Sequence, residues 1–469
     1  MNLVYGVKDR PKFGQMLIFA FQQLLAILAA TIAVPAIVGN GMSQSAALFG
    51  AGVGTIVYLL FTKFRSPVFL GSSFAFLPSM AAAFSGAYAG SVGGYAGLLL
   101  GAVFAGLVYV IIALVVKVAG VKWIDKLMPA VVIGPTVAII GLSLAGNAIG
   151  DAVGKNANGA VWDADASAWA MNPKAWLFLI CALVTLCVVI LCSVYGKKMM
   201  KLIPFIIGIV AGYIVATVFT LIGKGTGNET LIIIDFSKFA DMKWIPDFTF
   251  LKAFQGFKDL TGEHIASIAV AYIPVAFVVF AEHLADHKNL STIIGQDLTK
   301  DPGLHRTLLG DGVGSIAGAF FGGCPNTTYG ESIGCVAITR NASVVTILCT
   351  AVLCIIASFF APFVTFLATI PGCVMGGVCV TLYGFIAVSG LKMLQKVDLN
   401  DNRNLFTASV ILIAGIGGMA LLIGQVKLTA IACALILGIV VNLVVNLGKK
   451  KEEAAEETAS QNEKANEKK

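Results

Sequence analysis

Apolar stretches of roughly twenty residues recur along the whole chain and alternate with short polar connections. A helix of about that length crosses the hydrocarbon core of a bilayer, whereas strands of a membrane barrel would be about half as long and alternate in polarity. The pattern therefore predicts an all-α membrane protein. We expect about fourteen transmembrane segments, near residues 16–38, 46–61, 68–84, 94–116, 129–149, 176–194, 202–222, 265–282, 308–321, 328–338, 344–368, 374–394, 405–423 and 428–447.

Composition supports a membrane location and argues against a soluble domain. Hydrophobic residues fill 58% of the 469 positions, charged residues fill only 12%, and the mean hydropathy is +0.89. Such a chain needs lipid around it. The formal net charge of +7 is spread between the apolar stretches and forms no single basic patch, so we expect no nucleic-acid partner.

Basic residues concentrate in the connections of one side of the predicted bundle. An even number of segments places both termini on that side, and the positive-inside rule makes it the cytoplasmic face of a bacterial inner membrane. Residues 1–15 are then a cytoplasmic N-terminus, 223–264 an external loop, and the Lys- and Glu-rich stretch 449–469 a disordered cytoplasmic tail. The basic residues that carry this prediction include Lys8, Arg10, Lys12, Lys63, Arg65, Lys117, Lys197, Lys201, Arg340, Lys392 and Arg403.

Two polar stretches interrupt apolar segments and resemble one another. Residues 72–75 read Ser-Ser-Phe-Ala and residues 327–330 read Thr-Thr-Tyr-Gly, so both have two hydroxyls, an aromatic ring and a small residue in the same order. Residues 129–134 and 371–376 also share Pro, Val and Gly at the same internal spacing. Chance similarity between glycine-rich sequences is the alternative to an internal repeat.

The repeat interpretation predicts two copies of about seven segments each, over residues 16–222 and 265–448. An odd number of crossings forces the second copy to be inverted relative to the first. Secondary transporters are often built in this way, and their binding sites lie at the interrupted segments of the two copies. We therefore look for the site at the two polar stretches.

Three acidic residues fall within or next to predicted membrane segments. Glu282 ends the apolar run 269–281, Asp286 follows on the same helical face, and Glu331 lies in the second interrupted stretch. A carboxylate at bilayer depth costs about 2.5–3.5 kcal/mol on insertion scales, so such groups usually face a cavity and serve a function. For Asp286 a solvated helix end is the alternative, because Lys288 follows closely.

Interrupted helices offer backbone donors at membrane depth. N–H groups near Phe74 and Gly330 can meet carbonyl oxygens of a ligand, while Glu282 and Glu331 can accept its N–H groups. A small flat ligand with alternating C=O and N–H groups fits this set, and the rings of Phe74 and Tyr329 can stack on it. A nucleobase is the expected substrate class. Supporting polar side chains nearby are Gln22, Gln23, Ser73 and Ser332.

At these residues the chain resembles the nucleobase-ascorbate transporter family, and within it the bacterial uracil-permease branch. The resemblance covers nearly the whole membrane region. It includes the family signature over residues 331–340, which reads Glu-Ser-Ile-Gly, four further residues, then Thr-Arg. The other matching motifs are Gln22-Gln23, residues 71–76, Ala281-Glu282-His283 and the loop 301–306.

The resemblance implies a homodimeric proton symporter that works by alternating access. It implies two inverted repeats, with a core domain from segments 1 to 4 and 8 to 11 and a gate domain from the remaining segments. It also places substrate on the backbone amides of Phe74 and Gly330 and on the side chains of Glu282 and Glu331. Proton coupling would involve Glu282, Asp286 and Glu331.

Three departures from the family pattern bear on the substrate. The Gln-His pair usual in the first helix is Gln22-Gln23 here, and the signature Asn is Ser332. Asp286 replaces the histidine of well-known uracil permeases and is the residue that purine-transporting relatives often have. Glu331 points the other way, since purine transporters more often have Gln. Uracil is the expected substrate, with xanthine or another purine as the alternative.

Other functional classes fit the sequence less well. Anion exchangers of the same fold usually carry a soluble C-terminal domain, and paired carboxylates would repel their substrates. We find no nucleophile elbow, phosphate loop or set of metal ligands, so we expect no enzyme activity, no cofactor and no metal.

Overall fold

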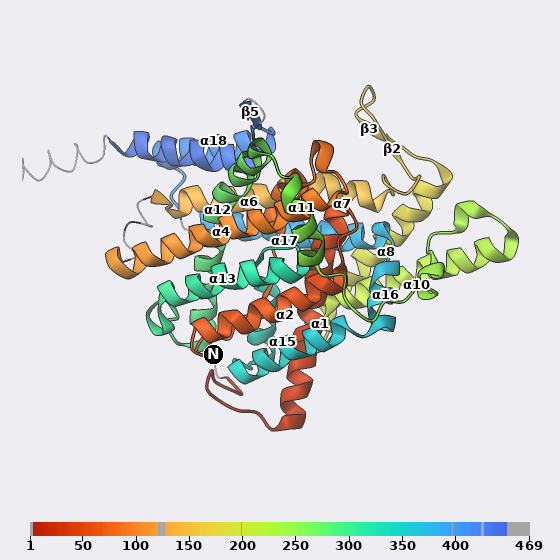
Figure 1. Ribbon diagram of the computed structural model, residues 1–469, viewed down its shortest axis with the longest axis horizontal. Helices are drawn as coiled ribbons and strands as arrows, with labels where there is room; N and C mark the ends of the chain where they lie inside the picture. The colour runs from red at the N-terminus through yellow and green to blue at the C-terminus, as the bar shows by residue number, and fades with distance from the viewer. Residues whose placement is uncertain are drawn as a thin grey trace, which may run out of the picture.

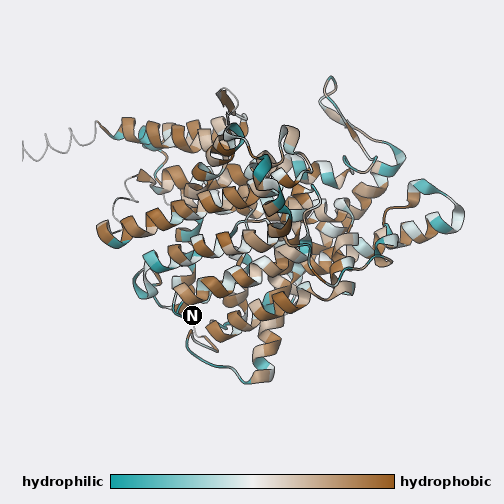
Figure 2. Cartoon of the chain, viewed as in Figure 1, coloured by the Kyte–Doolittle hydropathy of each residue, from teal (hydrophilic) through white to brown (hydrophobic). Residues whose placement is uncertain are grey.

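The computed structural model describes residues 3–120, 123, 127–197, 199–395, 397–423 and 426–447. Within these ranges the chain is mainly helical, with three small two-stranded sheets (Figure 1). Hydrophobic residues dominate the long helices, and hydrophilic ones gather in the connections (Figure 2). The predicted tail 449–469 lies outside the described residues.

Most of the predicted segments have a helix at their position, although the segment over 68–84 is a strand, a turn and a short helix, and the segment over 265–282 continues to Ile294. The helices of the first half are α1 (Phe13–Val38), α2 (Gln44–Phe61), α3 (Leu77–Ala83), α4 (Val92–Ala119), α6 (Ala130–Ser143), α7 (Ala145–Ala152), α8 (Pro173–Tyr195), α9 (Met199–Leu202), α10 (Pro204–Thr226) and α11 (Thr249–Gly256). Those of the second half are α12 (Gly262–Ile294), α13 (Leu304–Gly322), α14 (Gly330–Thr339), α15 (Val344–Ser358), α16 (Ala361–Thr369), α17 (Gly372–Leu394), α18 (Asn402–Ile416) and a last helix, Ala430–Leu447.

Among the described residues, nine helices are long and apolar enough to cross a membrane, or ten if the bent pair α15–α16 is one span. The bend of 81° interrupts a segment that the sequence predicted as continuous over 344–368. Pro362 explains it, because proline at the start of α16 has no N–H with which to continue the hydrogen bonds of α15. The protein is thus a multi-pass helical membrane protein.

The two interrupted stretches meet at the centre of the molecule. Strand β1 (Leu70–Ser72) pairs antiparallel with β4 (Asn326–Thr328), with Gly71 opposite Thr327. The Ser73 N–H donates to the Pro325 carbonyl (2.9 Å) and extends the ladder by one bond. A helix begins directly after each strand: the short 3-10 turn η1 (Phe74–Phe76) leads into α3, and α14 starts at Gly330. Phe74 and Gly330 therefore come together from the two halves of the chain. We call the β1–β4 ladder, together with η1 and the start of α14, the central crossing.

The remaining strands lie in the connections. Strand β2 (Val161–Asp163) pairs with β3 (Ala168–Ala170) in the hairpin that projects between α7 and α8 in Figure 1. Strand β5 (Leu421–Ile423) pairs with β6 (Val426–Leu428) before the last helix. Neither hairpin contributes to the central crossing.

Glycines let α2 and α13 pack closely beside the crossing. A Cβ on Gly50 would meet the carbonyl oxygen of Gly318, and one on Gly54 would meet the Gly314 carbonyl and the Asn326 amide. Small residues at such crossings are the usual means by which membrane helices gain packing. Helix α4 covers the other side of α13, and α15 packs against α2, so these four helices form neighbouring rows in Figure 1.

We predict that Gly50→Ala destabilises the protein, because the added methyl must push α2 away from α13. Overpacking of this kind costs about 1–3 kcal/mol, so the melting temperature of the purified protein in detergent falls. Gly14→Ala is the control, since a Cβ there meets no atom within 4 Å. Equal melting temperatures for the two variants would contradict the close α2–α13 contact.

Candidate functional site

A cavity of about 420 Å³ lies beside the central crossing. Glu282, Asp286 and Glu331 all line it, together with Gly330 and, from α9, Lys201. A smaller pocket of about 40 Å³ is lined by three of these same residues, Glu282, Gly330 and Glu331, and reaches the crossing itself. The structure thus brings the three predicted acidic residues to one space.

Two helices of different character supply the carboxylates. Helix α12 runs through the molecule for 33 residues, and the spacing of Glu282 and Asp286 puts both on the face that lines the cavity. Helix α14 starts beside the cavity, has Glu331 in its first turn, and receives no capping hydrogen bond from the side chain of Tyr329. Its first N–H groups have no partner within the helix, and the helix dipole favours negative charge there.

The backbone at Gly330 is open to the cavity. Gly330 is exposed although its neighbours Tyr329 and Ser332 are buried, and a Cβ on Gly330 would meet no atom within 4 Å. This glycine therefore leaves the start of α14 accessible to a small molecule.

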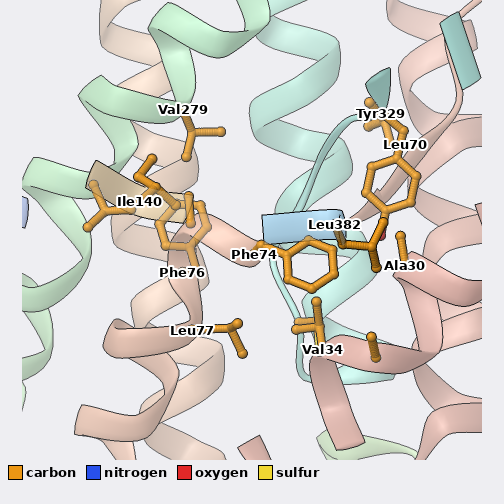
Figure 3. Packing of buried hydrophobic residues seen from close by; sticks show 14 of the residues in the cluster. Ala30, Val34, Leu70, Phe74, Phe76, Leu77, Ile140, Val279, Tyr329 and Leu382 are labelled. Carbon is orange, nitrogen blue, oxygen red and sulfur yellow. The ribbon is translucent and has the colours of Figure 1, made fainter. Parts of the chain in front are cut away.

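Phe74 occupies the corresponding position after β1. It is the first residue of η1, and no side chain caps that turn. Its ring is buried, packs edge-on against Tyr383 of α17 with centroids 5.7 Å apart, and lines the smaller pocket. Figure 3 shows it next to Leu382 and Val34. Phe74 is thus where the crossing touches α17.

Tyr329 and Ser73 are held within the crossing. The Tyr329 hydroxyl donates to the carbonyl of Ser72 (2.8 Å), and its ring packs on Gly71, where a Cβ would collide with it. Figure 3 shows the ring beside Leu70. Ser73 is buried and contributes its backbone to the ladder. Tyr329 also lines the smaller pocket, so it borders the site as well as bracing the crossing.

The predicted supporting residues of the first helix differ in their surroundings. Gln23 is buried, and its amide nitrogen donates to the hydroxyl and the carbonyl of Ser332. Gln22 is half-buried and lines neither of the two spaces described above. Gln23 and Ser332 therefore join α1 to α14.

Asp286 is tied to the crossing and is not at a solvated helix end. The Thr328 hydroxyl donates to its carboxylate (2.6 Å), which links α12 to β4. The alternative of a solvated end is wrong because α12 continues to Ile294, and the next residue, His287, is fully buried.

A second buried polar cluster lies next to the site and was missed from the sequence. His283 Nδ1 is 2.7 Å from the carboxylate of Asp311 on α13, and His283 Nε2 is 3.0 Å from the Thr307 hydroxyl. The His287 ring stacks on His283 at 4.0 Å, donates to its carbonyl, and contacts the Tyr58 hydroxyl (2.7 Å). An aspartate inside the predicted segment 308–321 was the signal that could have found this cluster.

Half-helices that meet at membrane depth, with carboxylates facing a cavity between helices, are the layout of a secondary transporter. The Xan_ur_permease family model, described as "Permease family", matches residues 14–424. The chain therefore belongs to this permease family, the nucleobase-ascorbate transporters that its motifs resemble.

Similar curated proteins carry permease names. The uracil permease of Bacillus caldolyticus is 40% identical over 441 residues, which cover 93% of each chain. The uracil permease of Escherichia coli K12 is 34% identical over 436 residues, or 92% of each chain. A putative pyrimidine permease of the same organism, RutG, is 30% identical over 92% of this chain and 89% of its own.

Solved structures of other transporters share the fold. The transmembrane domain of the cyanobacterial bicarbonate transporter BicA superposes with a TM-score of 0.62 at 16% identity, over 94% of this chain and 99% of its own. The murine anion transporter Slc26a9 gives a TM-score of 0.63 at 12% identity, over 94% of this chain and 69% of its own. At this identity the likeness extends to the fold alone.

We predict that His283→Leu strongly destabilises the protein, because it leaves the Asp311 carboxylate buried without its partner. Leaving a buried polar group without its hydrogen-bond partner costs about 1–3 kcal/mol. His283→Gln is the control, since its amide can still donate to Asp311. Melting temperatures of the two purified variants test this, and similar values would show that the contact with Asp311 contributes little.

Proposed function

We propose that the protein is a proton-coupled symporter that imports a nucleobase, most specifically uracil, by alternating access. One observation carries the proposal: Glu282 and Glu331 face one cavity at the uncapped start of α14. Substrate N–H groups would bind the two carboxylates, and substrate carbonyls the backbone amides near Gly330 and Phe74. The cavity volume falls in the range usual for small-molecule sites.

Uracil matches these groups without leaving any unpaired. It has two C=O and two N–H groups on one ring, whereas a purine brings a second ring with further nitrogens that need partners. The similar proteins named uracil permeases support the same choice. Asp286 favours the alternative of xanthine or another purine, but its carboxylate already accepts a hydrogen bond from Thr328.

We propose that the chain crosses the membrane about fourteen times. In the described part of the chain, ten helical spans are long and apolar enough when α15–α16 is counted as one. The stretch Phe74–Ala83 and the helices α13, α14 and α18 occupy the positions of the four further predicted segments. The count therefore depends on four helical stretches that are shorter or less apolar than the other spans.

The β1–β4 register supports the two inverted repeats. In the sequence comparison Ser72 corresponds to Thr327, and hence Gly71 to Asn326. Exchanging each residue for its counterpart turns the Gly71–Thr327 pair into the Asn326–Ser72 pair, which is also present in the ladder. An antiparallel pair with this property is what an inverted repeat produces.

Helix contacts support a core and a gate. Helices α1, α2 and α4 pack with α12, α13 and α15, which come from the expected core segments. Helices α6, α8 and α10 each pack with α17, and α10 also packs with α8. The cavity lies between the two groups, because α12 and α14 line one side of it and α17 another. Alternating access would move the groups relative to one another.

The orientation, partners and coupling complete the proposal. Lys201, one of the basic residues expected in the cytoplasm, lines the cavity, so this space would open to the cytoplasm of a bacterial inner membrane with both termini on that side. We also propose a homodimer, and proton coupling by Glu282, Asp286 and Glu331, since neighbouring carboxylates can share a proton.

We predict that unlabelled uracil competes with the uptake of labelled uracil at least about tenfold better than xanthine, a difference of about 1.4 kcal/mol. A site built to hydrogen-bond one ligand rejects others that leave its buried groups unpaired. Initial rates in cells that express the protein provide the measurement. Stronger competition by xanthine would instead identify a purine transporter.

We predict that Glu282→Gln abolishes the accumulation of uracil driven by a pH gradient in proteoliposomes, because the amide cannot bind and release the coupled proton. Glu263→Gln is the matched control, since Glu263 lies in the exposed first turn of the same helix. Undiminished accumulation by Glu282→Gln would remove this residue from the coupling mechanism.

A further inference from the structure

The two residues at the start of α14 that face the cavity are held between two anchors. The carbonyl of Phe69 accepts a hydrogen bond from the N–H of Tyr329 (3.3 Å), and the N–H of Phe69 donates to the hydroxyl of Ser332 (3.4 Å). Gly330 and Glu331 lie between these contacts. The backbone of Phe69, the residue before β1, thus contacts the chain on either side of Gly330 and Glu331.

The Ser332 anchor has a second support from α1. Gln23 Nε2 donates to the Ser332 hydroxyl (2.5 Å) and to the Ser332 carbonyl (3.3 Å). Gln23 is 3% exposed and Ser332 is fully buried. A buried amide and hydroxyl that lose their partners carry a desolvation penalty, so each side chain holds the other in place.

The two anchors differ in whether a side-chain substitution can remove them. The Tyr329 anchor joins two backbone groups and persists under most side-chain substitutions. The Ser332 anchor depends on the side chains at positions 23 and 332. Only this anchor can be tuned by mutation without altering a residue that lines the cavity, because neither Gln23 nor Ser332 lines it.

These positions are also two of the three at which the chain departs from the pattern of the family it resembles. The structure shows that both departures meet in a single contact. The long side chain of Gln23 on α1 reaches the short side chain of Ser332 on α14.

We propose that Gln23 and Ser332 act together as one positioning unit, which sets the positions of the Gly330 amide and the Glu331 carboxylate in the cavity. The inference rests on the proposed substrate site. Neither residue touches substrate: they act through the first turn of α14. Their loss weakens substrate binding and leaves the transport cycle itself intact.

The test measures KM and maximal rate of uracil uptake for Ser332→Ala, Gln23→Asn and the double variant. Asn keeps the amide but is shorter and cannot reach Ser332. Each single variant is expected to raise KM about tenfold with a maximal rate close to that of the unmodified protein, as for one buried hydrogen-bonded contact. The double variant is expected to be no worse than Ser332→Ala alone, because Ser332→Ala already removes the hydroxyl contact that Gln23→Asn would break.

Thr350→Ala is the matched control. The Thr350 hydroxyl also joins α1 to a neighbouring helix, by donating to the Ala20 carbonyl (3.3 Å), but it does not contact the start of α14. Its KM is expected to stay unchanged. The paired variant Gln23→His with Ser332→Asn, which carries the family residues at both positions, is expected to have a lower KM than either of its single variants.

An unchanged KM in Ser332→Ala, or single effects that add in the double variant, would overturn the positioning unit. A variant that loses only melting temperature would do so too, since that identifies a purely structural contact. Failure of the proposed function has a different signature: uracil uptake would then be absent in the unmodified protein or insensitive to Glu331→Gln.

Discussion

Backbone polar groups that lie at membrane depth must find partners inside the protein, and the β1–β4 ladder is where this chain meets that requirement. Two helices can begin in the middle of the molecule because the strands ahead of them satisfy each other. The open N–H groups of those helices then become available to a ligand. Without the ladder, the start of α14 and the turn at Phe74 would have no fixed position.

The packing around the ladder follows from the same requirement. The glycines of α2 and α13 let these two helices approach closely beside the crossing. Tyr329 fills the space above Gly71 and bonds the Ser72 carbonyl, so the aromatic ring closes the crossing from one side. Close packing at the site therefore comes from small residues as much as from large ones.

Sequence patterns predicted the membrane class, most segment positions and the three acidic residues of the cavity. The length of an apolar segment, and a charged residue within it, can be recognised from neighbouring positions in the chain. These patterns did not reveal the His283–Asp311 pair, since a contact between α12 and α13 depends on how the helices are arranged. The 81° bend before Pro362 was missed for a simpler reason: the apolar pattern continues through it. Pairing of Gln23 with Ser332 likewise needed the folded chain.

Helix α12 presents different chemistry on two faces, with Glu282 toward the cavity and His283 bonded to Asp311 within the protein. Any rotation of α12 about its own axis that withdrew Glu282 from the cavity would also pull His283 away from Asp311 and leave two buried polar groups without their partner. The hydrogen bond therefore opposes such a rotation. A change of access to the carboxylates is then expected from movement of the two helix groups relative to one another, with α12 keeping its orientation toward α13.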